Sequence, residues 1–430
     1  MYDHRKLGRE LGLFDSDPLI GSGLPYWLPA GAGIRQALER YITEVERRAG
    51  YQQVYSPVLG KRELYEISGH WSKYSDDMYP PMDIGGEQVV LRPSLCPHHA
   101  LIYRSRAHSY RELPLRISEL GGMYRSELSG VLGGLTRVRA IQLNDGHIFC
   151  SLDQVASEVR DALELINQAY RDMGIKAVRY VLSLPSEDAQ IGSPDSKYVG
   201  DPDSWAQAAG LLKDALDSAG IVYEEAPGEA AFYGPKIDIQ IEDAAGRESS
   251  LSTVQVDFHQ PAAFNLEYIG ADGNKHRPVM VHRSIVGSIE RAVAHLIEVH
   301  GGAFPAWLAP VQLVVLPISD AEEKVAADVV RRAVDRGIRV ELAHADEGSL
   351  GARIRENRLA PFQAVIGARE AAAGLLAIRH RDGQQVEPAP IGEALDEIRG
   401  AVDPWVRTAS PSQSPSQPQA ERADSNRGAL

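Results

Sequence analysis

The chain has 430 residues and a formal net charge of −14, from 45 Lys and Arg against 59 Asp and Glu. Apolar residues at 43% and charged residues at 24% are typical of a folded protein and exclude a mainly disordered chain. No segment approaches the ~20 apolar residues of a membrane span, the first residues lack the apolar core of a signal peptide, and two cysteines exclude a disulfide framework. We therefore expect a cytoplasmic protein, and the negative charge argues against one that coats nucleic acid.

The first 305 residues predict an antiparallel α+β domain. Apolar residues recur at helical spacing in two segments, and other segments alternate apolar and polar residues as strands do. Strands in series with a few long helices favour an antiparallel sheet. The expected elements are a helix at 34–45, an extended segment at 51–55, a helix at 155–170, strands at 236–241, 253–258 and 279–282, and a helix from Ile285.

Residues 310–403 predict a small α/β domain. Val311–Ile318 is an unbroken apolar run, as in a strand buried on both faces. Strands and helices then alternate, with helices expected at 320–336, 350–358 and 391–402 and strands at 338–342, 363–367 and 375–379. Residues 408–430 are rich in Ser, Pro and Gln, which predicts a disordered tail.

The stretch 101–140 departs from the acidic average, with seven arginines, three glutamates and no lysine. The planar guanidinium favours bidentate contact with phosphate, so this composition indicates a nucleotide site or an ordinary solvated face. Arg125 and Arg137 flank the Gly-rich turn at 129–134 and could hold two phosphates of one polyphosphate. Glu127 is expected to point the same way as Arg125 along a strand, with a surface ion pair as the alternative.

Two further groups of residues are weak signals when taken singly. Gly287 and Arg291 are four residues apart, so we expect them to share a helix face, where the glycine either leaves room for a flat ligand or allows close helix packing. Cys96, His147 and His282 are ligand types that zinc accepts. Their spacing is too wide for a motif, and a buried cysteine with two ordinary histidines is the alternative.

Taken in order, these signals resemble the class II aminoacyl-tRNA synthetases, and among them the threonyl-tRNA synthetase family. The resemblance spans about residues 1–403 and combines many short motifs, each of them weak alone. The matching segments are Asp3–Gly8, Gly69–Trp71, Cys96–Pro97, Tyr110–Arg116, Arg125–Glu127, Leu135–Arg139, Asp145–Cys150, Phe232–Lys236, Thr253–Gln255, His282–Arg283, Gly287–Arg291 and Trp307–Gln312.

The resemblance implies a fold and an activity. The fold is an α+β catalytic domain over 1–305 with an antiparallel sheet, then an α/β anticodon-binding domain over 310–403, in a homodimer whose interface element corresponds to residues 34–57. The activity is adenylation of threonine by ATP with Mg²⁺, followed by transfer to tRNA(Thr).

The resemblance also implies roles for single residues. Catalytic roles fall to Arg125, Arg291, Lys236 and His70, and ATP binding to Arg125, Glu127, Arg137, Gly287 and Arg291. Asp145, Tyr233 and Gln255 match amino-acid-binding residues, and Cys96, His147 and His282 match the ligands of one Zn²⁺ per chain. Three protein ligands leave positions for the amine and hydroxyl of threonine, which would separate threonine from valine.

The sequence departs from the family at its start and in its pocket. It begins at what is normally the linker into the catalytic core, which implies a form without the N-terminal editing domains. We expect serine, which lacks only a methyl group, to be a side substrate that this chain cannot clear. Ser94, Leu95, Leu143 and Ser252 replace the usual pocket residues. These changes leave a related β-hydroxy amino acid or altered inhibitor sensitivity open.

The C-terminal domain departs from the family in charge. Residues 310–403 contain 12 Lys and Arg and 16 Asp and Glu, a net charge of −4. Residues 347–349 and Asp382 replace polar or basic residues of the family, whereas Glu370, Arg379 and Arg381 stand at matching positions. We therefore expect altered anticodon contacts. Two other functions stay open: delivery of the activated amino acid to a carrier protein or small-molecule acceptor, and a non-catalytic regulatory role.

Overall fold

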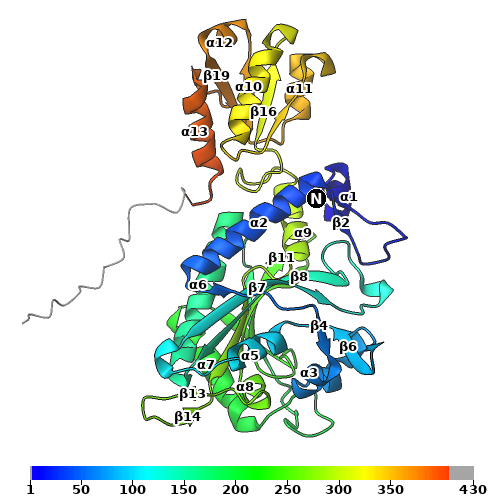
Figure 1. Cartoon of the computed structure of the whole chain (residues 1–430), viewed down its shortest axis with the longest axis vertical. Helices are drawn as coiled ribbons and strands as arrows, with labels where there is room; N and C mark the ends of the chain where they lie inside the picture. The colour runs from blue at the N-terminus through cyan, green and yellow to red at the C-terminus, as the bar shows by residue number, and fades with distance from the viewer. Residues whose placement is uncertain (1, 244, 406–430) are drawn as a thin grey trace, which may run out of the picture.

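Two large sheets, each with its own helices, organise the protein (Figure 1). The computed structural model describes residues 2–243 and 245–405, so the tail expected at 408–430 lies outside the described residues. Within those residues, each helix is too short or too polar to cross a membrane.

The larger sheet has eight strands in the order β10-β9-β11-β12-β15-β8-β7-β3. The six central strands pair antiparallel, which confirms the predicted sheet type, and only the two outermost pairings are parallel. In sheet order the strands are β10 (Tyr223–Pro227), β9 (Arg179–Leu184), β11 (Lys236–Glu242), β12 (Glu248–Asp257), β15 (Val279–Ser284), β8 (Ala140–Cys150), β7 (Leu115–Tyr124) and β3 (Gln52–Gln53).

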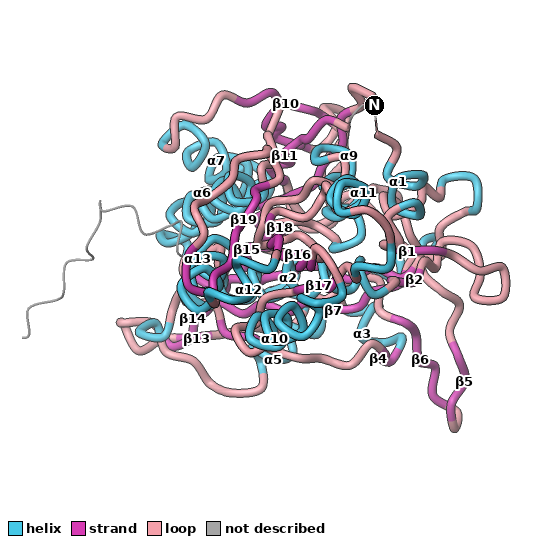
Figure 2. Tube along the Cα trace, turned by 90° about the horizontal axis from the view of Figure 1, so that it is seen from above, coloured by secondary structure: helices cyan, strands magenta, loops and turns pink. Residues whose placement is uncertain are grey.

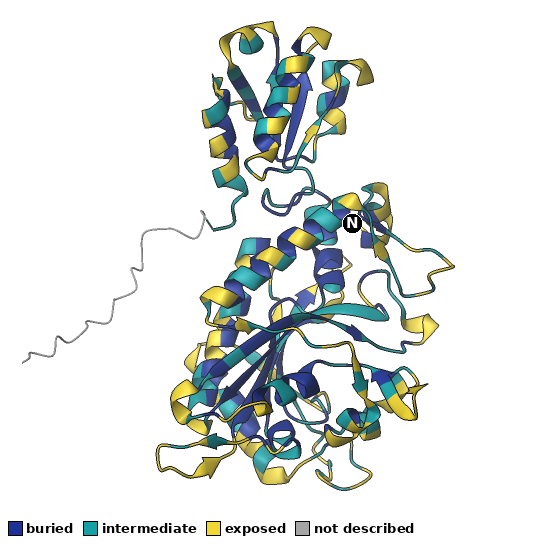
Figure 3. Cartoon of the chain, viewed as in Figure 1, coloured by how far each residue is buried: buried dark blue, intermediate teal, exposed yellow. Residues whose placement is uncertain are grey.

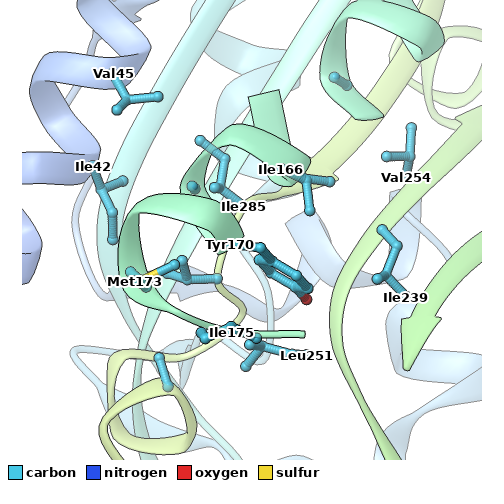
Figure 4. Packing of buried hydrophobic residues seen from close by; sticks show 14 of the residues in the cluster. Ile42, Val45, Ile166, Tyr170, Met173, Ile175, Ile239, Leu251, Val254 and Ile285 are labelled. Carbon is cyan, nitrogen blue, oxygen red and sulfur yellow. The ribbon is translucent and has the colours of Figure 1, made fainter. Parts of the chain in front are cut away.

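One face of this sheet packs against helices α2 (Pro29–Arg48), α6 (Val155–Met173), α7 (Pro202–Ser218) and α9 (Ile289–His300). Side chains on a strand alternate between the faces, so every second residue joins this hydrophobic core. Ile239 and Val254 contribute from the strands, and Ile166 and Tyr170 contribute from α6 (Figure 4). The intervening residues of the same strands point to the opposite face, where the candidate site lies.

Shorter elements complete this unit. Helix α5 (Cys96–Arg104) carries the first candidate metal ligand, and a three-stranded sheet of β4, β6 and β5 projects from the body (Figure 2). These and the other short elements are α1 (His4–Glu10), β1 (Phe14–Asp15), β2 (Tyr26–Trp27), β4 (Leu59–Lys61), α3 (Arg62–Ile67), α4 (His70–Lys73), β5 (Met82–Ile84), β6 (Glu87–Leu91), α8 (His259–Ala263), β13 (Tyr268–Ile269) and β14 (Lys275–His276).

The second large sheet has five strands in the order β17-β16-β18-β19-β20. Its strand β16 (Leu313–Pro317), which pairs with β17 on one side and β18 on the other, is buried throughout, as predicted for a strand covered on both faces (Figure 3). Leu313 and Val315 belong to one hydrophobic cluster, and Val314 and Leu316 belong to another. The remaining elements are α10 (Glu323–Val334), β17 (Val340–Leu342), α11 (Leu350–Glu356), β18 (Phe362–Ile366), α12 (Ala368–Ala373), β19 (Leu375–His380), β20 (Ala389–Pro390) and α13 (Ile391–Val402).

Two local expectations about secondary structure are wrong. Strand β15 continues to Ser284 and α9 begins only at Ile289, because the Ser288 side chain accepts a hydrogen bond from the Arg291 amide and caps the helix there. Ile285 therefore lies between strand and helix. Strand β7 ends at Tyr124, so Arg125 and its neighbours follow the strand instead of belonging to it.

Candidate active site

A cavity of about 340 Å³ opens on the face of the large sheet that the long helices leave uncovered. Its floor consists of the alternate strand residues, for example Thr253 and Gln255 on β12, whose neighbours Val254 and Val256 are in the hydrophobic core. Loops after β7 and before α9 form its sides. Most of the predicted site residues line this cavity, namely Cys96, Arg125, Glu127, Arg137, Asp145, Tyr233, Lys236, Gln255, His282, Gly287 and Arg291.

At one end of the cavity the side chains of Cys96, His147 and His282 meet. Strands β8 and β15 pair so that His147 stands directly opposite His282, and the first residue of α5 brings in the thiol. One ligand atom from each residue lies within 4.8 Å of the others. All three residues are buried, and burial raises the pKa of the Cys96 thiol and lowers the pKa of His147. A thiolate at this position therefore needs a cation beside it, and neutral imidazoles are the form that binds metals.

Each of these two histidines has one ring nitrogen held by another buried group. His99 Nδ1 lies 2.6 Å from His147 Nδ1, and His99 Nε2 lies 3.2 Å from a Glu119 carboxylate oxygen. His282 Nε2 lies 2.8 Å from Asp257 Oδ2. His147 Nε2 and His282 Nδ1 face each other at 3.0 Å, which leaves these two atoms and the thiol as one donor set. This donor set fits zinc, whose histidine ligands usually carry such supporting hydrogen bonds.

Polar side chains extend from this end along the cavity. The Tyr233 ring stacks on the His282 ring at 4.9 Å, and its hydroxyl donates to the Gln255 side chain. Lys236 forms an ion pair with Asp238. Burial raises the pKa of Asp145, the acid beside the histidine pair. The arrangement offers several hydrogen-bonding groups to a small polar molecule bound next to the three candidate ligands.

The opposite end of the cavity is rich in arginine. The Arg125 guanidinium lies over the Tyr74 ring at 5.4 Å, and its buried Nε has no hydrogen-bond partner in the described protein. Arg137 Nε donates to Glu127 Oε2 at 2.9 Å, so these two residues form an ion pair on the cavity wall. The expectation that Arg125 and Glu127 share a strand is wrong, although both side chains reach the same cavity.

Arg291 closes this end of the cavity. Its guanidinium donates to the backbone oxygens of Thr136 at 3.2 Å and Ser250 at 2.9 Å. Burial lowers the pKa of Arg291, and the positive charges of Arg125 and Arg137 lower it further. The positive charges of these three guanidinium groups repel one another, and a bound polyanion would stabilise them.

Gly287 has a different role from the one its spacing suggested. It precedes α9 and has a φ of 62°, so it does not share a helix face with Arg291. A Cβ at this position would lie 2.3 Å from the Leu251 carbonyl oxygen. The glycine is required by the turn between β15 and α9, and this turn forms part of the cavity wall.

His70 lies just outside the cavity lining and contacts its metal-ligand end. Its Nε2 is 2.9 Å from Ser94 Oγ and 3.8 Å from Cys96 Sγ, and its Nδ1 is 2.8 Å from Ser68 Oγ. Burial lowers its pKa to about 3. Burial thus favours the neutral form of the His70 imidazole, and both of its ring nitrogens lie within hydrogen-bond distance of serine hydroxyls.

Sequence reasoning missed the supporting residues His99, Glu119 and Asp257. They belong to no motif of recognisable spacing, because β7, α5 and β12 come together only in the folded sheet. The one available signal is compositional: His99 is a histidine on a mostly apolar helix, and Glu119 is an acid inside an apolar strand.

Comparisons with known proteins identify a family for this chain. Residues 79–300 match the family model "tRNA synthetase class II core domain (G, H, P, S and T)", and residues 312–400 match "Anticodon binding domain". The threonine–tRNA ligase of Geobacillus sp. (strain WCH70) is 47% identical over 403 residues, which is 93% of this chain and 62% of that relative. Threonine–tRNA ligase 1 of Bacillus subtilis (strain 168) is 49% identical over 395 residues, 91% of this chain and 60% of that relative.

A solved structure matches over nearly its whole length. It is described as the RNA binding domain of threonyl-tRNA synthetase from Cryptosporidium parvum Iowa II, with 35% identity and a TM-score of 0.86. The match covers 92% of this chain and 98% of that one. The chain thus spans about three fifths of the length of the curated relatives above but almost all of this structure.

Proposed function

Because the chain belongs to the class II aminoacyl-tRNA synthetases, and among them to the threonyl-tRNA synthetases, we propose that it activates threonine with ATP and transfers it to tRNA(Thr). The observation that carries this proposal is one cavity with two chemically different ends. Arginines gather at one end, and Cys96, His147 and His282 converge at the other. A nucleotide triphosphate and a small polar amino acid would meet between them.

Arg125 is the residue that we propose contacts the reacting phosphate. In adenylation the threonine carboxylate attacks the α-phosphate of ATP, a bond forms between carboxylate oxygen and phosphorus, and pyrophosphate leaves. Negative charge grows on the α-phosphate oxygens as this happens, and the Arg125 guanidinium, whose buried Nε has no hydrogen-bond partner among the described residues, would stabilise it. Arg137 and Arg291 would bind the remaining phosphates and the adenine side, with Glu127 and Gly287 shaping the wall. Mg²⁺ would accompany ATP.

The other end would hold the amino acid. We propose that Cys96, His147 and His282 hold one Zn²⁺, which would supply a Lewis acid for the amine and hydroxyl of threonine. Asp145 would accept a hydrogen bond from the substrate hydroxyl, and Tyr233, Gln255 and Lys236 would position the rest of the amino acid. His70 would assist transfer to the tRNA ribose.

This recognition predicts how substrates are ranked. Valine lacks the hydroxyl and leaves the polar groups of the pocket unpaired, which is a large penalty. Serine keeps both polar groups and lacks one methyl group, a difference of only about 1–3 kcal/mol. We therefore propose serine as a side substrate. Homodimer formation, a cytoplasmic location and binding of tRNA by the C-terminal unit belong to the same proposal.

Two assays test the proposal. Amino-acid-dependent exchange of pyrophosphate into ATP is expected with threonine, more weakly with serine, and not with valine. Replacing Arg125 by Gln should lower the exchange rate by about 10²–10³-fold, since one stabilising donor in the transition state is removed. Arg106→Gln is the control, because Arg106 lies in the same arginine-rich stretch but pairs with Glu112 outside the cavity.

Charging of a tRNA(Thr) transcript then shows whether tRNA is the acceptor of the activated amino acid. Formation of threonyl-tRNA supports the ligase, whereas exchange without charging would point to a carrier protein or small-molecule acceptor. No exchange with any amino acid would overturn both enzymatic functions and leave the regulatory one.

A further inference from the structure

A second cavity, of about 240 Å³, lies where the two units of the chain meet. We name it the junction cavity. It is formed by α2, the segment around residues 307–312, the turn between α10 and β17, α13, and residues 403–405. Four arginines line it, Arg40, Arg336, Arg339 and Arg399, against one acid, Asp403. The Asp403 carboxylate already accepts a hydrogen bond from the Trp405 amide.

The four arginines differ in how they are held. Arg339 is the fixed one, because its guanidinium donates to the Ala309 oxygen at 2.9 Å and the Trp307 oxygen at 2.8 Å. Burial lowers its pKa to about 10, and the nearby charge of Arg40 acts in the same direction. Arg336 pairs with the exposed Asp396 at 2.8 Å.

Arg40 and Arg399 are the free cations of this cavity. Both are exposed, and within residues 2–243 and 245–405 neither has a hydrogen bond or an ion pair with a protein group. Arg40 comes from α2 of the catalytic unit, within the 34–57 segment expected at the homodimer interface, and its side chain lines the cavity beside Arg339. Arg399 comes from the C-terminal unit. The four arginines outnumber the acids around them, Asp403 in the cavity and Asp396 beside Arg336 and Arg399, so the cavity carries a net positive charge that would attract an anion.

The aromatic residues of the cavity restrict what that anion can be. The Trp405 ring stacks on Tyr41 at 5.3 Å, and the Arg48 guanidinium lies over Trp405 at 4.1 Å. Because Trp405 is packed by both groups, its ring is a poor platform for a nucleobase. The junction cavity therefore offers charge without base stacking, which suits a phosphate group.

We propose that the junction cavity binds a backbone phosphate of the tRNA, with Arg40 and Arg399 as ligands from the two units. This rests on the proposed function, which requires one RNA to reach both units. It also accounts for a feature of the C-terminal unit, whose net charge of −4 gives little general attraction for RNA. A phosphate contact of this kind orients the RNA independently of its sequence.

The test uses the full chain and a deacylated tRNA(Thr) transcript. The double variant Arg40→Gln, Arg399→Gln removes both free cations and breaks no hydrogen bond. Its control is Arg160→Gln, Lys176→Gln, which removes the same charge from two exposed side chains outside the cavity. We measure Kd between about 50 and 200 mM salt, where phosphate contacts give a linear dependence of log K on log salt.

The double variant should bind on the order of tenfold more weakly at low salt, with the salt slope reduced by about one, because the contact with one phosphate is lost. The control should keep a slope close to that of the unmodified protein. An unchanged slope in the double variant, or an equal loss in the control, would overturn the proposal. Binding of inorganic phosphate that depends on Arg40, without any change in tRNA binding, would also overturn it in favour of a small-anion site.

Two further measurements separate this proposal from the proposed function. Threonine-dependent pyrophosphate exchange needs no tRNA, so it should be unchanged in the double variant. If the unmodified protein shows no exchange, the proposed threonine activation is wrong. The tRNA titration can still be interpreted in that case, because it does not depend on activation. The mass in solution is measured as well, because a change in oligomeric state that accompanies weaker binding would assign Arg40 and Arg399 to a protein interface and overturn the proposal.

Discussion

His99 shows how much of the candidate zinc site is determined by residues that would not touch the metal. It contacts His147 on one side and Glu119 on the other, and Glu119 is paired at 2.9 Å with the buried guanidinium of Arg92. This buried chain fixes the ring orientation of His147 so that its Nε2 faces His282. Supporting contacts of this kind usually contribute substantially to metal affinity.

We expect His99→Ala to weaken zinc binding by about 10–100-fold, because it leaves His147 Nδ1 without its partner. The measurement is competition for Zn²⁺ against a chromophoric chelator, which does not depend on enzyme activity. His98→Ala is the matched control, since His98 is the adjacent buried histidine of the same helix and makes no contact with the ligand set. Equal affinity in His99→Ala and the unmodified protein would contradict a supporting role.

The candidate site residues could be predicted from the sequence where family motifs contain them, as with Arg125 and His282. The geometry of these residues in the cavity could not be predicted from the sequence. Gly287 has the spacing of a helical residue, yet the cap at Ser288 starts the helix two residues later. Asp257 gives no local signal, because its role depends on the register that pairs β12 with β15.

Strand β15 and helix α2 are joined through a buried ion pair that few local signals in the sequence indicate. Arg283 of β15 lies 2.7 Å from the Glu46 carboxylate of α2, and both side chains are essentially inaccessible to solvent. The Arg283 guanidinium lies over the Tyr51 ring at 4.1 Å and directly above Gly146 of β8. A Cβ at position 146 would be 2.3 Å from Arg283 Cζ.

Gly146→Ala should therefore destabilise the protein by about 1–3 kcal/mol, since the guanidinium can move only by disturbing its buried partner. The free energy of unfolding is measured by urea denaturation with a metal chelator present, so that the adjacent His147 does not contribute through zinc. Gly130→Ala is the control, because a Cβ there has no neighbour within 4 Å and should change stability by less than about 0.5 kcal/mol. Equal unfolding midpoints for the two variants would show that Arg283 has room to shift.

The long elements were predictable because their packing leaves a periodic pattern. Helix α6 repeats its buried residues at helical spacing, and β16 is an apolar run buried on both faces. Helix α7 carries the same signal in Trp205, Ala208 and Leu212, although it was not among the predicted elements. The order of the strands in the sheet could not be predicted from residue periodicity. Strands β9 and β11, for example, are neighbours in the sheet but are separated in the chain by α7 and β10.

At the scale of the whole molecule, the two edges of the eight-stranded sheet differ in their surroundings. Strand β3 forms one edge and β10 the other. Beyond β3 the chain exposes Tyr55, 87% accessible, followed by the half-exposed Val58 and Leu59. Exposed apolar side chains beside an unpaired edge are typical of an interface. This edge belongs to the 34–57 segment that we expect to form the homodimer.

Tyr55→Asp should convert the proposed homodimer into a monomer, because the interface would have to bury an unpaired carboxylate. Sedimentation velocity at micromolar protein concentration measures this directly. Val222→Asp is the matched control: Val222 is 90% exposed and immediately precedes β10 at the opposite edge of the same sheet. It should leave the dimer intact. Dissociation in Val222→Asp alone would move the interface to the β10 edge. A monomeric unmodified protein would remove the homodimer from the proposed function. The proposed adenylation would still be judged separately by pyrophosphate exchange, because the residues proposed for it lie in one cavity of one chain.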